Sequence, residues 1–137
     1  MKYLYIIIAV LMLTFTAYSE SSDAHQEHAD DHADAGKLQV ALHDGQRWKM
    51  DDHTRSMFKA MTERIEAGGD IETVGKGLKA ELDKLIQGCT MTGEAHNQLH
   101  AFLTAFIPAV QEVATKGSAD SLKKVSELLR EYPKYFE

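Results

Sequence analysis

Apolar residues recur every three or four positions in four successive stretches of the chain. This spacing is typical of amphipathic helices that bury one face. Each stretch lies between residues that favour helix ends, either small polar caps or glycine and proline. The expected boundaries are Asp51 or Asp52 to Gly68-Gly69, Asp70 to Gly88, Thr92 to beyond Val113, and Ser118 or Asp120 to Pro133.

The four stretches predict an all-α protein. Amphipathic helices joined by short connections are most economically packed as an antiparallel four-helix bundle. Within the third stretch we expect Pro108 to kink the helix, because its ring removes a backbone donor. Gly75 and Gly77 interrupt the apolar stripe of the second stretch, where glycine weakens a helix.

Residues 1–19 have the pattern of a secretory signal peptide. Lys2 is followed by an apolar run over residues 4–15, and Ala17 with Ser19 offers small residues for cleavage. The apolar run is shorter than the roughly 18 to 20 residues that a membrane-spanning helix needs. We therefore predict a periplasmic or secreted protein that has no membrane contact after cleavage.

Residues 20–36 are expected to form a disordered, acidic tail, since they contain no large apolar residue that could be buried. The tail carries His25, His28 and His32, and such tracts bind metals weakly. A purely solubilising role is the alternative. Residues 37–137 are predicted to be the bundle domain, beginning with an extended or short-helical arm in which Trp48 packs on the helices.

The charge and the single cysteine narrow the possible partners. The net charge is −6, so the chain has no electrostatic reason to bind nucleic acid or an anionic membrane. Cys89 is the only cysteine and cannot form a disulfide within the chain. Three roles remain open for Cys89, namely a buried thiol, an intermolecular disulfide and a metal thiolate. The chain is expected to be a monomer or a homodimer.

Metal-capable side chains are densest between Cys89 and His100. His96 and His100 are four residues apart, so a helix places both rings on one face, within reach of one ion. Cys89 and Met91 lie just before the expected helix, whose positive end would favour a thiolate. Glu94 is expected to orient a histidine or cap the helix.

A second set with the same spacing lies in the first helix. His53, Met57 and Met61 follow one another at four-residue intervals and would join the first set if the first and third helices face each other. The alternative for the two methionines is core packing, which is the commoner role at helical spacing.

The combination of thiolate, thioether and imidazole suits copper, particularly Cu(I). Zinc would accept the cysteine and histidines but gains little from methionine. The sequence therefore predicts a metal-binding protein, with copper preferred and an envelope metal-handling or redox protein as the possible partner.

The run CTMTGEAHNQLH, preceded by GQRWK, resembles a group of small exported helical bundles of Bacteroidota-type bacteria. The resemblance implies a periplasmic bundle and no established activity. The architecture is also similar to cytochrome b562-like bundles, which hold haem between a Met and a His. That similarity leaves a b-type haem electron carrier, or a structural bundle without a cofactor, as alternatives.

Known catalytic motifs are missing from the sequence. It contains no C-x-x-C-H, H-E-x-x-H or G-x-S-x-G pattern, and the glycines around Lys76 lack the spacing of a phosphate loop. An enzyme is therefore the less favoured class.

Overall fold

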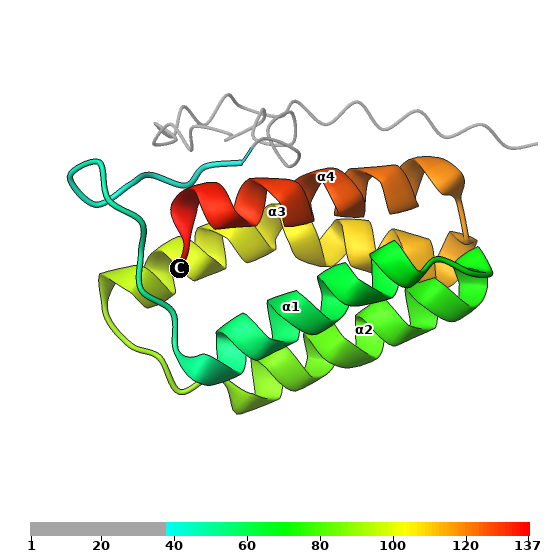
Figure 1. Cartoon of the computed structure of the whole chain (residues 1–137), viewed down its shortest axis with the longest axis horizontal. Helices are drawn as coiled ribbons and strands as arrows, with labels where there is room; N and C mark the ends of the chain where they lie inside the picture. Colours follow the sequence, from blue (N-terminus) through cyan, green and yellow to red (C-terminus); the bar gives the residue numbers. More distant parts are fainter. Residues whose placement is uncertain (1–37) are drawn as a thin grey trace, which may run out of the picture. The chain divides into compact units, whose positions relative to one another are not determined.

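The computed structural model describes residues 38–137, which form a four-helix bundle (Figure 1). The helices are α1 (Asp52–Ala67), α2 (Ile71–Gly88), α3 (Glu94–Lys116) and α4 (Ala119–Tyr135). The all-α four-helix prediction is confirmed. No helix in this part of the chain is long and apolar enough to cross a membrane. The predicted signal peptide and the histidine-rich tail lie outside the described residues.

Three of the helices begin at the polar caps that the sequence predicts. The side chains of Asp51, Asp70 and Ser118 accept hydrogen bonds from backbone N–H groups in the first turns of α1, α2 and α4. Such bonds satisfy donors that have no partner within the helix. For Asp70, the bonds from Thr73 hold the pKa of the carboxyl below its usual value.

Two helix boundaries differ from the prediction. Helix α3 begins at Glu94 rather than Thr92, because Gly93 adopts a positive φ of 78° and turns the chain into the helix. Helix α4 continues through Pro133 to Tyr135, and the buried side chains of Tyr132 and Phe136 on either side of the proline hold this last turn on the core. Helix α3 likewise runs without interruption across Pro108.

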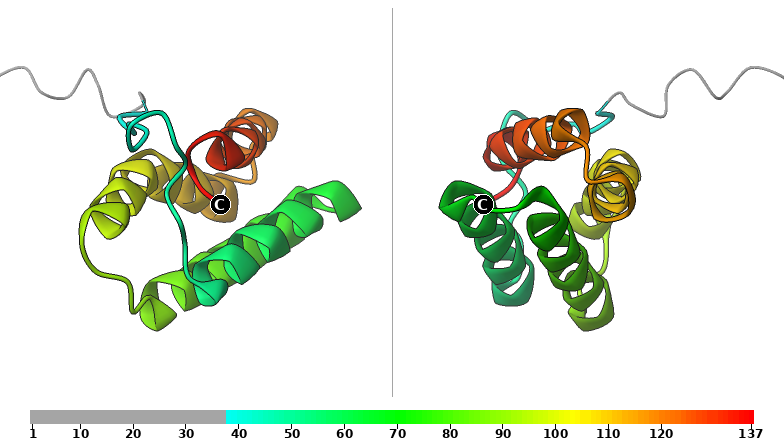
Figure 2. Two further views of the ribbon diagram at one scale, coloured as in Figure 1. Left: turned by 60° about the vertical axis from the view of Figure 1, so that its left-hand side comes forward. Right: turned by 90° about the vertical axis from the view of Figure 1, so that its right-hand side faces the viewer.

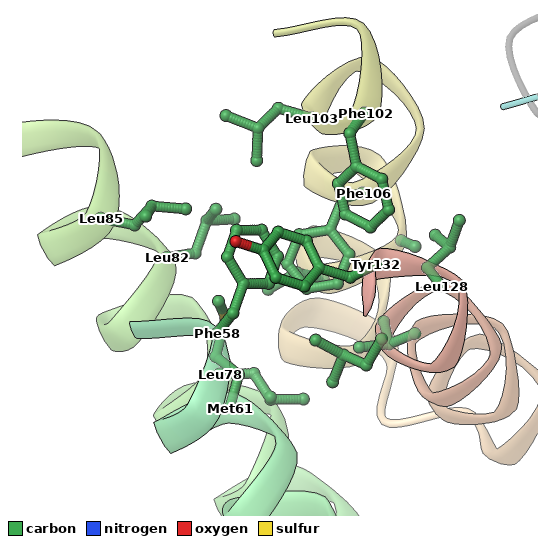
Figure 3. Packing of buried hydrophobic residues seen from close by; sticks show 14 of the residues in the cluster. Phe58, Met61, Leu78, Leu82, Leu85, Phe102, Leu103, Phe106, Leu128 and Tyr132 are labelled. Carbon is green, nitrogen blue, oxygen red and sulfur yellow. The ribbon is translucent and has the colours of Figure 1, made fainter. Parts of the chain in front are cut away.

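Consecutive helices run antiparallel around a common core (Figures 1 and 2). Helix α2 packs against both α1 and α3, and α4 packs mainly against α3 and less closely against α1. The centre of the core is a cluster of rings from α1, α3, α4 and the C-terminus (Figure 3). Its members are Phe58, Phe102, Phe106, Tyr132 and Phe136.

Tyr132 is tightly held in this cluster. Its ring stacks on Phe58 with centroids 3.8 Å apart and meets Phe102 edge-on at 5.7 Å. Its hydroxyl is buried and has no hydrogen-bond partner among the described residues. Burial raises the pKa of this hydroxyl well above its ordinary value.

The arm is extended and pairs with the C-terminus. The Trp48 N–H donates to the Tyr135 carbonyl at 2.7 Å, and the Glu137 N–H donates to the Trp48 carbonyl at 2.9 Å. The indole N–H of Trp48 donates to the Ala41 carbonyl at 2.6 Å. The arm therefore closes the end of the bundle, with Trp48 packed against the core.

The glycines in α2 are places of close approach. A Cβ at Gly75 would lie 2.8 Å from the carbonyl oxygen of Val113 in α3. A Cβ at Gly77 would lie 2.4 Å from the guanidinium of Arg64 in α1. These glycines let α2 sit close to both neighbours, which accounts for the interruptions in its apolar stripe.

Replacing Gly75 with alanine should lower the free energy of unfolding by about 1 to 3 kcal/mol, as expected for overpacking. Helix propensity alone predicts the opposite, a gain of up to about 1 kcal/mol. Urea unfolding followed by circular dichroism would distinguish the two. A more stable Gly75→Ala variant would contradict this packing of α2 on α3.

Candidate metal site

The first two turns of α3 hold a histidine pair. The Nε2 atoms of His96 and His100 lie 2.8 Å apart, and their ring centroids lie 4.4 Å apart. A hydrogen bond of this kind requires one ring to donate and the other to accept. His96 is half-buried and His100 is exposed. The predicted juxtaposition of the two rings on one helix face is confirmed.

The pair lines a hollow that also contains Cys89. The hollow has a volume of about 240 Å³ and lies between the end of α2 and the start of α3. Its lining contains a thiol, two imidazoles, four aliphatic side chains and no charged group. The lining residues are Leu85, Ile86, Cys89, His96, Leu99, His100 and Leu103.

The electrostatic setting of Cys89 differs from the prediction. Cys89 is the C-terminal cap of α2 and is separated from the start of α3 by a short connection, so it does not lie at the positive end of a helix. The C-terminal end of a helix carries partial negative charge, and α2 has no basic residue in its last turn. This end of α2 therefore favours a bound cation.

Met91 points to a different neighbour. Its Sδ accepts a hydrogen bond from the Thr54 hydroxyl of α1 at 3.6 Å, and Thr54 is fully buried. Met91 is not among the residues that line the hollow. The structure thus places this thioether against α1 rather than beside the histidine pair.

The predicted second set in α1 does not converge with the first. His53 donates from Nε2 to the Lys84 carbonyl at 3.0 Å, and its ring lies on Gly88. Met57 is half-buried, and Met61 is fully buried in the core. None of these three residues lines the hollow.

Glu94 organises the start of α3 by bonding to two neighbouring amides rather than to a histidine. Its carboxylate accepts from the side-chain amides of Asn97 and Gln98 at 3.2 and 3.1 Å. Both bonds lower the pKa of Glu94, and the bond from Gln98 has the larger effect. Gln98 in turn accepts from the Ala41 N–H at 3.0 Å. This network fixes the arm to the helix that carries the histidines.

The hollow is not a preassembled three-ligand site. Within residues 38–137, no three His, Cys, Asp or Glu side chains are grouped closely enough to hold a metal ion. Two imidazole nitrogens on one tetrahedral ion lie about 3.3 Å apart, given bonds of about 2.0 to 2.1 Å. The observed 2.8 Å separation of the two Nε2 atoms is about 0.5 Å shorter than this value. Cys89 lines the same hollow but is not grouped with the two histidines.

Comparison with protein-family models, curated proteins and solved structures finds no match for the chain. The functional argument therefore depends on the chemistry of the site. The resemblance to exported bundles stays a prediction.

The packing of the core bears on one form of the haem alternative. The cluster of rings centred on Phe58, Phe102 and Tyr132 lies in the core. The histidine pair lines the hollow between α2 and α3, whereas Met61 is buried in the core. A haem held between Met61 and this pair would require the rings to be displaced.

A second hollow, between α1 and α4, has no counterpart in the sequence analysis. Its volume is about 590 Å³, and Phe58, Leu129 and Tyr132 form part of its wall. Charged residues of both signs surround it. It exists because α1 and α4 pack less closely than the other neighbours, a property that helical periodicity alone does not reveal.

Proposed function

We propose that this chain is an exported metal-binding protein that holds Cu(I) in the hollow between α2 and α3, as a copper buffer or carrier. His96 and His100 supply imidazole nitrogens, and Cys89 supplies a thiolate after losing its proton to solvent. The observation that carries the proposal is the 2.8 Å approach of the two Nε2 atoms in a hollow that Cys89 also lines.

The donor set favours a soft or borderline cation. Thiolate and imidazole suit Cu(I) and Zn(II), whereas magnesium and calcium prefer oxygen, and no carboxylate lines this hollow. The end of α2 adds partial negative charge, and its own last turn contains no basic residue. His100 is exposed, so an ion can enter and leave from solvent, as a buffer or carrier requires.

Single substitutions of the ligands should weaken Cu(I) binding by an order of magnitude or more. Cys89→Ser removes the soft donor, and His96→Ala removes one imidazole together with its bond to His100. The measurement is a competition titration against a chromophoric Cu(I) chelator under reducing conditions.

His43→Ala is the matched control. His43 lies in the arm, exposed and stacked on Trp48, and does not line the hollow. Its loss should leave the Cu(I) affinity within about twofold. Unchanged affinity in both Cys89→Ser and His96→Ala would disprove the proposed ligands.

A further inference from the structure

The rim of the hollow carries an unusual apolar side chain. Ile86 is 50% exposed, and in the described part of the chain only Leu42, at 41%, is another exposed large hydrophobic residue. It lies beside Cys89, His96 and His100 in the same lining. None of the lining residues is charged, although 26% of the chain is. Depletion of charge is typical of the core of protein interfaces.

The coordination that one chain offers is incomplete. Structural zinc sites built from cysteine and histidine are usually closed by four ligands. The hollow contains three donors, and Cys89 is not grouped with the two histidines. No carboxylate in the lining can supply the fourth position. A tightly held Zn(II) ion therefore needs at least one donor from outside the hollow.

We propose that a second copy of this chain docks on this face and that the two copies share one Zn(II) ion. A two-fold axis through the face brings each residue near its counterpart, so Cys89 and one ring of the histidine pair from each copy give a closed set of two thiolates and two imidazoles. Ile86 of each copy is covered by the other. The lack of charge at the face lets two chains of net charge −6 approach there without local repulsion.

This inference depends on the proposed metal binding but can fail separately. The full chain is titrated with Zn(II) and, in a parallel series, with Cu(I), under reducing conditions that prevent a Cys89 disulfide. Sedimentation equilibrium gives the mass and elemental analysis gives the metal content. We expect the mass to double on loading with Zn(II), with half an ion per chain, and a chelator to restore the monomer.

Substitutions at the rim identify the surface. Ile86→Asp should raise the dimer dissociation constant at least tenfold, because a charge would be buried against its counterpart. Leu42→Asp, at the other exposed hydrophobic residue, should leave it unchanged. Replacing His25, His28 and His32 with alanine should also leave the loaded dimer intact.

The outcomes separate the two proposals. One Zn(II) ion per monomer would overturn the shared site and leave metal binding standing. Dimers that form without metal, that are insensitive to Ile86→Asp, or that require the tail histidines would also overturn it. Absence of binding for both metals would overturn the shared site and the proposed function together.

Discussion

Phe102→Ala should lower the free energy of unfolding by about 3 to 5 kcal/mol, the range for removing a large ring from a well-packed core. Phe102 is fully buried at the centre of the cluster of rings. It contacts Phe58 and Phe106 at centroid distances of 5.6 Å each, and Tyr132 and Phe136 at 5.7 Å each. Because these neighbours come from α1, α3, α4 and the C-terminal residues, local relaxation cannot fill the cavity.

Chemical denaturation measures this loss. Lys124→Ala, at an exposed position on α4, is the surface control and should change stability by less than about 0.5 kcal/mol. A loss below about 1 kcal/mol for Phe102→Ala would contradict the placement of this ring at the centre of the bundle.

Arg64→Leu should destabilise the protein by about 2 to 3 kcal/mol, somewhat less than the loss for breaking a fully buried ion pair. The Nε and Nη2 atoms of Arg64 both donate to Oε1 of Glu81, at 3.0 and 2.6 Å. The Glu81 side chain is only 12% exposed, and its Oε2 is buried without a partner in the described structure. Removing Arg64 therefore leaves a carboxylate between α1 and α2 without its counter-charge.

The double variant Arg64→Leu/Glu81→Leu should recover most of this loss, because no unpaired charge remains. Arg47→Leu is the matched surface control. The side chains of Arg47 and its partner Glu137 are both more than 40% exposed. The loss of unfolding free energy should therefore stay below about 1 kcal/mol. Equal losses for Arg64→Leu and Arg47→Leu would show that burial adds nothing to the Arg64–Glu81 pair.

Local chemistry made most of the fold predictable. Asp51, Asp70 and Ser118 cap helices because the hydrogen bond that defines a cap spans only three residues. The continuation of α4 past Pro133 was missed, because it depends on contacts of Tyr132 and Phe136 with distant parts of the chain. Helix propensity predicts that Gly75 and Gly77 weaken a helix, whereas their role depends on which residues α2 contacts in α3 and α1.

In the candidate site, too, features within one helix were predictable, whereas features that depend on helix packing were not. The approach of His96 and His100 follows from helix geometry alone, so their spacing was sufficient. The positions of Met91 and His53 depend on the order in which the helices pack. Met91 contacts Thr54 of α1, and His53 lies on Gly88 at the end of α2. Spacing within one helix carries no information about that order.

The proposed metal site is the hollow between α2 and α3, with Cys89, His96 and His100 as ligands. A Cu(I) competition titration of the wild-type chain beside the Cys89→Ser/His96→Ala/His100→Ala variant tests it, with circular dichroism to show that both are folded. We expect Cu(I) binding in the wild type that the folded variant loses. Equal binding by both chains, or by neither, would contradict it.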